Sequence, residues 1–425
     1  MDKRLEILEK YNFWHKNQPE EGFLRESYTE KIIKYTGNNL IKVLTGQRRT
    51  GKSYIMRQLA LQLVSNGVNK KNICYINLEM LNFDFIKNHK DLDSLVKFYK
   101  SSIEPKGRVY LFIDEVQNVD GWEKLVNSYS QDYTEDIEIF ISGSNSKMLS
   151  GELATLLSGR YINFTIFPLS FIEYCGILKC ENDKQAYLNY LQTGGMPELF
   201  RLKDEEVRRN YIRALKDSVM FRDIIQRYRV SDPILLEDVF SYLVNNSSSI
   251  ISVNNIANYF KSNLRKTSYD TISNYIGYFE DAFLVHRADR YNIKGKDILG
   301  GNRKYYINDL SFSNFLYKGF GYGHGFKLEN LVYLDLLRAG YNVYVGEINA
   351  KEVDFVAIKS DQKIYVQCCY MLVDEITTER EYSSLLSVKD SYPKFVVSLD
   401  DLKLNSNQGI EHIQAWKFAE LCEKL

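Results

Sequence analysis

Eight consecutive residues have the types and spacing of a phosphate-binding loop. They read Gly46-Gln47-Arg48-Arg49-Thr50-Gly51-Lys52-Ser53 and match the pattern G-x-x-x-x-G-K-[ST] in full. Glycine lets backbone N–H groups wrap phosphate oxygens without obstruction, and the helix that follows points its positive end toward them. We expect the loop to bind ATP, with Lys52 reaching the β- and γ-phosphates and the Ser53 hydroxyl binding Mg²⁺.

The sequence does not assign a role to two arginines of this loop. Arg48 and Arg49 occupy variable positions of the pattern. There, an arginine that contacts the nucleotide or a partner and an arginine that is only a solvated surface charge are equally supported. For the loop as a whole, the alternative is a glycine-rich turn followed by Lys-Ser by accident. Glycine makes up about 7% of residues in an average protein, so an accidental match to the pattern is expected in roughly one chain in a hundred.

A second segment combines a buried strand with two carboxylates. Residues 109–117 read VYLFIDEVQ, an apolar run that ends in Asp114 and Glu115. A buried strand tolerates such charges only where they meet a metal or substrate. Because neighbours on a strand point to opposite sides, we expect different roles for them. Asp114 would hold a Mg²⁺-bound water, and Glu115 would orient and deprotonate the water that attacks the γ-phosphate. The alternative is a solvated strand end.

The next apolar segment also ends in polar residues. It reads IEIFISGSNS from residue 137, and in a parallel sheet it would deliver Ser142 and Ser144 to the edge where ligands bind. Either serine is a candidate sensor of the γ-phosphate, and a helix N-cap is the equally weighted alternative. Arg160, in LLSGRYINF, follows a helical stretch. Taken alone, such an arginine is more often half of a surface ion pair.

These motifs need a parallel sheet that brings several strand ends to one edge. Apolar segments alternate with helical stretches, which predicts an α/β fold with helices on both faces of the sheet. We expect strands at residues 40–44, 73–78, 109–113, 137–141 and 161–167. A P-loop NTPase domain, preceded by a polar leader, is therefore predicted for residues 1–170.

The rest of the chain divides by pattern into three further parts. Apolar residues spaced three and four apart predict a helical lid or bundle over 171–232. Over 233–315, two short helices precede the β-rich pair LVHRADRY and NRKYYIND, in the order of a winged helix. Over 316–425, the helix ENLVYLDLLRAG precedes the strand candidates YNVYVG, EVDFVAIK, KIYVQCCY and KFVVSL, which predict a small α/β domain.

Composition limits the partners and the compartment. Lys and Arg total 55, as do Asp and Glu, so any basic surface must be local. The first residues lack the apolar stretch of a signal peptide, and no segment approaches the roughly 18 apolar residues of a membrane-spanning helix. Six cysteines show no C-x-x-C spacing. We expect a cytoplasmic protein with reduced thiols and no membrane partner.

Five segments, taken in order, resemble the prokaryotic AAA-type ATPases, an AAA+ group related to the archaeal ATPases that carries a C-terminal domain of uncharacterised function. The segments are GQRRTGKS, LFIDEVQNVDGWEKLVN, FISGSNSKMLSGELATLLSGR, FPLSFIEY and TGGMPELF. The resemblance spans nearly the entire chain and implies an AAA+-like parallel sheet. It also implies that Arg160 is an arginine finger and Ser144 the sensor. A finger that acts in trans would require a homo-oligomer.

The same resemblance implies a PD-(D/E)XK nuclease fold for residues 316–425. An active site of that fold has an acidic residue on a helix, an Asp on one strand and E-x-K on the next, which bind divalent metal and position a water. Glu329 and Asp354 fill the first two places, whereas the third reads Gln367-Cys368-Cys369. Without that carboxylate and lysine, the domain is expected to be degenerate and to bind rather than cut.

These features favour one function and leave two alternatives. We expect Mg²⁺-dependent ATP binding and hydrolysis that drives a conformational change on a partner, with DNA or a protein as the candidates. The first alternative is a slow, nucleotide-gated switch or binding module without substantial turnover. The second, with least support, is an ATP-dependent nuclease.

For DNA, the reading helix of the winged helix would be residues 267–279, which contain no Lys or Arg. Basic residues beside this helix would contact phosphates instead. They are Lys261, Arg265, Lys266, Arg287 and Arg290. A winged helix that packs internally, as a protein-interaction module, is at least as well supported.

Overall fold

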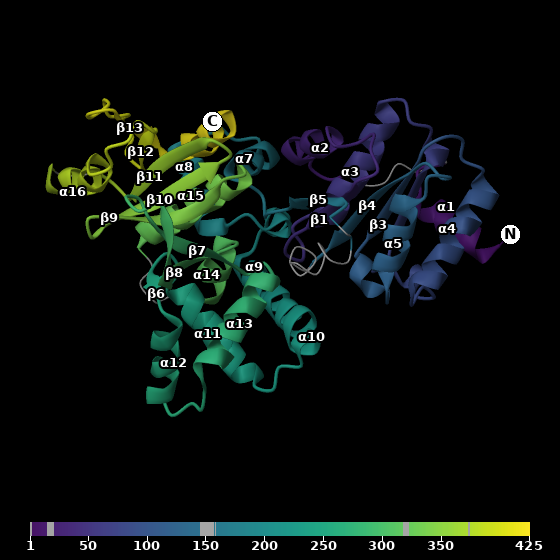
Figure 1. The fold of residues 1–425 in the computed structure, drawn as a ribbon, viewed down its shortest axis with the longest axis horizontal. Coiled ribbons are helices and arrows are strands. Elements are labelled where there is room, and N and C mark those ends of the chain that lie inside the picture. Colours follow the sequence, from purple (N-terminus) through teal and green to yellow (C-terminus); the bar gives the residue numbers. More distant parts are fainter. Residues whose placement is uncertain (1, 15–20, 145–156, 158, 318–322, 373–374) are drawn as a thin grey trace. The chain divides into compact units, whose positions relative to one another are not determined.

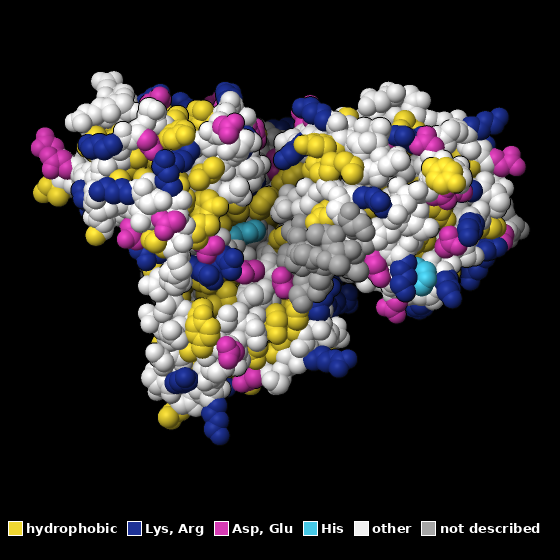
Figure 2. Space-filling view, viewed as in Figure 1, with side chains coloured by type: hydrophobic (Ala, Val, Ile, Leu, Met, Phe, Trp, Pro, Cys, Tyr) yellow, Lys and Arg dark blue, Asp and Glu magenta, His cyan; other side chains and the backbone are white. Residues whose placement is uncertain are grey.

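The computed structural model describes residues 2–14, 21–144, 157, 159–317, 323–372 and 375–425. By its packing the chain forms two compact units, Met1–Ile166 and Phe167–Leu425, which we call the amino-terminal and carboxyl-terminal units. Figure 1 shows their helices and strands, and each unit has its own sheet. The finer division at residues 170, 232 and 315 stays a prediction. Basic and acidic side chains are interspersed over the face seen in Figure 2, as expected from the balanced charge.

A five-stranded parallel sheet forms the centre of the amino-terminal unit, in the order β2-β3-β4-β1-β5. The strands are β1 (Ile41–Thr45), β2 (Ile73–Asn77), β3 (Val109–Asp114), β4 (Ile137–Gly143) and β5 (Tyr161–Thr165). The predicted α/β fold with a parallel sheet is confirmed, and the strand ends differ from the expected ones by a residue or two. Because all strands run in one direction, their carboxyl ends meet at one edge.

Helices cover both faces of this sheet (Figure 1). On one face lie α1 (Lys3–Tyr11), α4 (His89–Ile103) and α5 (Trp122–Gln131), and on the other lie α2 (Glu26–Ile33) and α3 (Lys52–Ser65). Val43 packs into the first core and Leu44 into the second, as the alternation of side chains along a strand requires. Burial on both sides explains why these strands read as continuous apolar runs.

The order of strands in space differs from their order in sequence. β4 lies between β1 and β3 and pairs with both. The strand that ends at Ser142 and Gly143 therefore lies between the strand leading to the phosphate loop and the strand carrying Asp114. β2, which separates the two motifs in sequence, lies at the edge of the sheet instead.

The carboxyl-terminal unit begins with helices, as the apolar spacing predicts. They are α7 (Phe171–Leu178), α8 (Lys184–Thr193), α9 (Glu205–Ser218), a π-helix (Val219–Ile225), α10 (Gln226–Tyr228) and α11 (Pro233–Asn245). Ser170 and Glu173 form a capping box that starts α7. The π-helix joins α9 to α10, so residues 205–228 form one continuous helical segment, which we call the long helix.

An eight-stranded mixed sheet follows, in the order β13-β12-β11-β10-β9-β7-β8-β6. Its strands are β6 (Ile250–Ile251), β7 (Val285–Asn292), β8 (Asp297–Ile307), β9 (Asn342–Ile348), β10 (Lys351–Lys359), β11 (Gln362–Cys369), β12 (Lys394–Ser398) and β13 (Ile410–Gln414). The helices around it are α12 (Val253–Ser262), α13 (Tyr269–Asp281), α14 (Leu310–Leu316), α15 (His324–Arg338), α16 (Glu375–Leu386) and α17 (Ala415–Lys424).

The helix, helix, hairpin order expected for a winged helix is present as α12, α13, β7 and β8. This hairpin does not form a sheet of its own, because β7 pairs in parallel with β9, through Arg290 and Val345 among others. The hairpin and the strands at the end of the chain therefore share one sheet and one unit.

Candidate functional site

The loop between β1 and α3 has a shape that requires glycine at two positions. Gly46 has φ of 148°, and a Cβ atom there would lie 2.2 Å from the carbonyl oxygen of Ile166. The Ile166 N–H donates to the Thr45 carbonyl oxygen at 2.7 Å, which fixes this close approach. Gly51 has φ of 97°, in the left-handed region, directly before α3 begins at Lys52. The loop therefore leads its backbone directly to a helix amino terminus, the arrangement that favours an anion.

Lys52 joins the loop to the end of β3. Its side chain is buried, with 4% exposed. The ammonium donates to the carbonyl oxygens of Gly46 at 2.9 Å and Gln47 at 3.0 Å. It also lies 3.9 Å from Glu115 Oε1. The structure thus brings residues of both predicted motifs into one site.

Asp114 is fully buried, and hydroxyl and amide groups surround its carboxylate. Tyr75 donates its hydroxyl proton at 2.7 Å, and Asn77 Nδ2 donates at 3.2 Å. The Ser142 hydroxyl donates to the other carboxylate oxygen. The Ser53 hydroxyl of the phosphate loop is close enough to lower the pKa of the Asp114 carboxyl, against the effect of burial. The two residues expected to hold Mg²⁺, Ser53 and Asp114, therefore lie side by side.

Glu115 has an unusual backbone at the end of β3. Its φ of 56° and ψ of 50° lie in the left-handed region. Non-glycine residues seldom adopt this conformation, and those that do cluster at functional sites. Its carboxylate accepts a hydrogen bond from Gln117 Nε2. Burial raises the pKa of the Asp114 carboxyl above its ordinary value, and the charge of Glu115 raises this pKa further.

Ser142 links the two acidic residues. Its hydroxyl donates to the Asp114 carboxylate and accepts the backbone N–H of Glu115 at 3.0 Å. Ser144 is also buried, one residue beyond the end of β4, and residues 145–156 lie outside the described residues. The Ser142 hydroxyl is thus joined to both Asp114 and Glu115.

Arg160 lies at the opposite edge of the sheet. Its carbonyl oxygen accepts the N–H of Ile41 at 2.9 Å, at the start of β1, whereas Gly46 follows the end of that strand. The five residues of β1 separate these two edges, which corresponds to about 13–16 Å. The Arg160 side chain is exposed. Within this chain, Arg160 is therefore not brought together with Lys52 and Glu115.

The other loop residues differ in their surroundings. Gln47 and Thr50 are buried, and Thr50 Oγ1 donates to the Gln47 carbonyl oxygen at 2.9 Å. Arg48 forms an ion pair with Glu79 at 2.6 Å. Arg49 is exposed and has φ of 70°. Of the two arginines left open by the sequence, one contacts a carboxylate of its own unit and the other is at the surface.

The polar leader contributes residues that sequence reasoning missed. The Gln58 side chain, on α3, donates to the carbonyl oxygens of Glu21 and Phe23 at 2.7 and 2.8 Å and accepts the N–H of Arg25 at 3.2 Å. The buried Arg25 guanidinium then donates to the Thr50 carbonyl oxygen at 2.9 Å. The leader is therefore fastened across the helix that begins the site. A single Arg and a single Gln have no characteristic spacing, so no signal in the sequence marks them.

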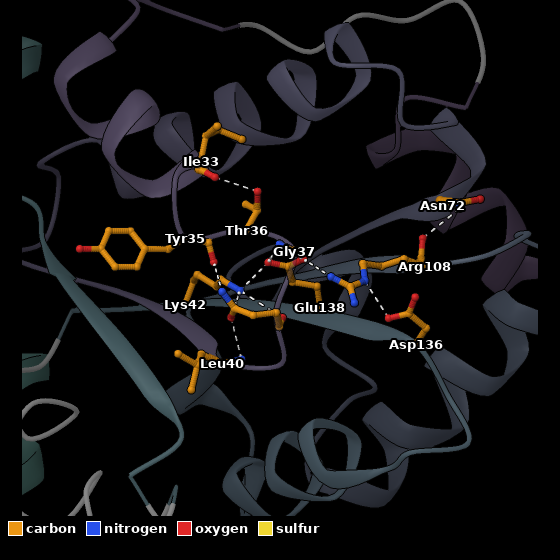
Figure 3. A network of polar contacts seen from close by, with 11 residues as sticks. Ile33, Tyr35, Thr36, Gly37, Leu40, Lys42, Asn72, Arg108, Asp136 and Glu138 are labelled. Atoms are coloured by element: carbon orange, nitrogen blue, oxygen red, sulfur yellow. Dashed lines mark hydrogen bonds and ion pairs between the residues drawn. The ribbon is translucent and has the colours of Figure 1, made fainter.

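A second polar network connects the amino ends of the strands (Figure 3). Lys42 of β1 and Glu138 of β4 form an ion pair with both side chains 0% exposed. Glu138 also accepts hydrogen bonds from Arg108 at 3.3 Å and from the Gly37 N–H at 3.0 Å. Since β1 and β4 carry the phosphate loop and Ser142 at their other ends, this pair helps to fix the two strands relative to each other.

In the carboxyl-terminal unit, the expected acidic residues surround a lysine. Lys304 of β8 donates to Glu329 Oε1 at 2.9 Å and lies 2.7 Å from Glu352 Oε1 and 3.8 Å from Asp354 Oδ1. Gln367 Oε1 accepts the N–H of Asp354 at 3.3 Å. Sequence reasoning missed Lys304, because β8 precedes the acidic residues and no motif connects it to them.

This acidic cluster is neutralised from within rather than open to a cation. Burial raises the pKa of the Glu329 and Asp354 carboxyls above their ordinary values. The Lys304 ammonium supplies positive charge among them. In the part of the chain that the structure describes, no group of three or more His, Cys, Asp or Glu side chains is arranged to hold a metal ion.

Most of the basic residues expected to contact DNA are paired within the carboxyl-terminal unit. The pairs are Arg265 with Asp238, Arg287 with Glu280 and Asp289, and Arg290 with Glu347. Lys261 and Lys266 are exposed. The positive charge beside the helix of residues 267–279 is therefore smaller than the sequence suggests.

The fold and the site define an AAA-type P-loop protein, and comparison with known families agrees. Residues 38–175 match the family model described as an AAA domain. Residues 184–321 match a domain of unknown function.

Two relatives align with most of the chain. An uncharacterised protein of Haemophilus influenzae is 35% identical over 393 residues, which cover 92% of this chain and 96% of that protein. An uncharacterised protein of Methanocaldococcus jannaschii is 33% identical over 398 residues, which cover 88% of this chain and 84% of that protein. The chain therefore belongs to the same family as these two uncharacterised proteins, and its own residues 38–175 match an AAA domain.

Solved structures with a similar fold are more distant. The Walker-type ATPase of Pyrococcus abyssi is 15% identical with a TM-score of 0.46, over 72% of this chain and 99% of that chain. The Holliday junction branch migration motor of Thermotoga maritima is 15% identical with a TM-score of 0.34, over 64% and 92%. The two family models reported above cover residues 38–175 and 184–321, so they give no support to the nuclease fold expected for residues 316–425. The domain model that reaches furthest ends at residue 321 and has no known function.

Among the described residues, no helix combines the length and the apolar character of a membrane-spanning segment.

Proposed function

We propose that the amino-terminal unit binds ATP with Mg²⁺ and hydrolyses it, and that this cycle drives a conformational change on a partner. The observation that carries the proposal is the approach of Lys52 Nζ to Glu115 Oε1, 3.9 Å apart, next to the buried Asp114 carboxyl, whose pKa Ser53 lowers. A buried ammonium, a buried acid pair and a glycine-shaped loop at a helix amino terminus together fit a triphosphate and its metal.

Each residue has a distinct role in this proposal. The backbone of residues 46–53 and the Lys52 ammonium bind the phosphates. The Ser53 hydroxyl would bind Mg²⁺, and Asp114 would hold a water bound to the ion, which prefers oxygen ligands. When bound, Mg²⁺ neutralises charge on the phosphate oxygens. Glu115 orients the attacking water and accepts its proton.

The test uses the full chain and three variants. Lys52→Ala is expected to lose ATP binding and phosphate release, because the ammonium is removed from the site. Glu115→Gln is expected to keep binding, measured by calorimetry, and to lose turnover. Lys124→Ala, at an exposed lysine on α5, serves as the matched control and should behave as the unmodified protein. Undiminished hydrolysis in both site variants would remove the proposal.

In this proposal, Arg160 acts as an arginine finger on the nucleotide bound by a neighbouring copy of the chain. The support for this is its exposed position at the edge of the sheet opposite the phosphate loop. Arg160→Ala is then expected to bind ATP and lose turnover. A mixture of Arg160→Ala with Glu115→Gln should regain part of the activity, because each variant supplies what the other lacks. A mixture that stays as inactive as its components argues against a finger in trans.

A slow, nucleotide-gated switch is the second candidate, and one contact favours it. Gln117 Nε2 donates to the Glu115 carboxylate, which competes with the water that Glu115 would have to bind. If this contact limits turnover, Gln117→Ala should raise the single-turnover rate and leave ATP affinity unchanged. A rate that stays slow in Gln117→Ala would show that this contact does not limit turnover. If the slow rate also does not depend on protein concentration, the switch is still favoured, but not because of Gln117.

A further inference from the structure

The arginines of the carboxyl-terminal unit differ in their pairing. All those after residue 230 form ion pairs with carboxylates of the same unit, and they are Arg265, Arg287, Arg290, Arg303, Arg338 and Arg380. Four earlier ones are exposed and form no ion pair with any residue in the described ranges. These are Arg213, Arg222, Arg227 and Arg229. We call these four residues the arginine ridge.

The arginine ridge follows a single structural element. Arg213 lies on α9, Arg222 on the π-helix and Arg227 on α10, and Arg229 directly follows. At about 1.5 Å per residue, the ridge extends roughly 20–25 Å along the long helix. Figure 2 shows basic side chains projecting from the part of the carboxyl-terminal unit that Figure 1 labels α10. The positive charge is therefore spread over the length of this segment and around its axis, because Arg213, Arg222 and Arg227 do not share one face of the helix.

Acidic residues within the same stretch do little to neutralise the ridge. Asp217 lies 3.2 Å from Lys216, whose ammonium also contacts Glu237. Asp223 is buried. The guanidinium groups of the ridge are thus left to interact with an external anion.

An exposed aromatic ring lies within the arginine ridge. In the π-helix, Val219, Met220 and Ile224 are buried, whereas Phe221 is 53% exposed beside the exposed Arg222. π-Helices are rare and are frequent at functional sites. Large exposed aromatic side chains among arginines are suited to stack on flat, uncharged rings while the guanidinium groups bind anions.

We propose that the arginine ridge and Phe221 form a binding site for single-stranded nucleic acid. Guanidinium groups bind phosphate oxygens in a bidentate manner, and four of them exposed on one helical segment can contact several phosphates of one strand. Phe221 stacks on an unpaired base, which a duplex does not offer. This surface is distinct from the helix and hairpin of residues 252–307, whose arginines are already paired. It also does not depend on the nucleotide site.

The experiment measures fluorescence anisotropy of a labelled oligothymidylate of about 20 nucleotides with the full chain and without ATP. If four arginines neutralise four phosphates, the logarithm of the affinity should fall against the logarithm of the salt concentration with a slope of about 3. The double variant Arg222→Glu/Arg227→Glu should lower this slope by about 1.4 and weaken binding at least tenfold near 0.1 M salt. Phe221→Ala should weaken binding about tenfold without changing the slope.

A matched control places the same charge change on another surface of the unit. Lys261→Glu/Lys266→Glu, at the exposed lysines beside the helix of residues 267–279, should bind as the unmodified protein does. Circular dichroism checks that all variants fold. Binding that survives the arginine variant, or that is lost in the lysine variant, overturns the proposal. So does a duplex of the same length that binds as tightly as the single strand. Binding to phosphatidylserine vesicles without binding to the oligonucleotide would assign the ridge to a lipid surface instead.

Discussion

The Ser142 hydroxyl donates a hydrogen bond to Asp114 and accepts one from the backbone N–H of Glu115 at 3.0 Å. One side chain of β4 therefore orients both acidic residues at the end of β3. The first of these bonds restrains the carboxylate expected to hold Mg²⁺. The second restrains the left-handed backbone that directs Glu115.

Replacing Ser142 by alanine should therefore affect turnover more than binding. Removing a hydrogen bond to a charged group costs about 1.5–3 kcal/mol, which corresponds to a rate reduced roughly ten- to hundredfold. Steady-state phosphate release measures the rate, and calorimetry measures ATP affinity, which should change little. Ser130→Ala is the control, because Ser130 is a buried serine of α5 that bonds only its own helix, at Asn127, in the described structure. A full rate in Ser142→Ala would contradict the role of this hydroxyl.

Arg25 is expected to act as a positioning residue for the phosphate loop. Arg25→Ala removes the hydrogen bond to the Thr50 carbonyl oxygen, which helps to order the phosphate loop. If the loss of this bond costs roughly 1.4 kcal/mol of binding free energy, ATP should bind about tenfold more weakly. Titration calorimetry gives the affinity. Arg4→Ala removes an exposed arginine of α1 that pairs with Asp2 and should leave the affinity unchanged. Equal affinities for the Arg25 variant and the unmodified protein would show that the leader does not order the loop.

The buried pair of Lys42 and Glu138 should be costly to break. Lys42→Met leaves a carboxylate buried without its ammonium, and such changes destabilise by about 3–5 kcal/mol. Urea unfolding followed by circular dichroism measures the free energy. Lys87→Met breaks the exposed pair with Asp84, whose side chains are 64% and 66% exposed, and should cost no more than about 1 kcal/mol. The double variant Lys42→Met/Glu138→Leu should regain part of the loss. Similar small costs for Lys42→Met and Lys87→Met would contradict the prediction.

Asp335 on α15 should make stability depend on pH. Its side chain is 5% exposed, and burial raises its pKa from 3.8 to about 6, against the opposing effect of Arg338. Between these two values the folded protein binds more protons than the unfolded chain, so stability falls as pH rises. Asp335→Asn has no carboxyl group to ionise at this buried position and so avoids this loss of stability. The variant should match the unmodified protein near pH 4 and be more stable at pH 7.5, by about 2–3 kcal/mol. Greater stability of the unmodified protein at pH 7.5 would mean that the pair with Arg338 outweighs burial.

The sequence by itself determined the features that are local in the chain. The spacing of Gly46, Gly51 and Lys52, and the apolar run that ends at Asp114, depend on neighbouring residues alone. Alternation of apolar segments with helical stretches predicted a parallel α/β sheet, which the structure confirms. These features are readable because backbone conformation and burial pattern act over a few residues.

Only the tertiary structure decided which distant residues meet. It placed β4 between β1 and β3, which put Ser142 against Asp114, and it placed Arg160 at the far edge of the sheet. It set Lys304 among the acidic residues and paired most of the basic residues expected to contact DNA. Such contacts follow from packing of elements separated by tens of residues, and single residue types at those positions carry no spacing that could announce them.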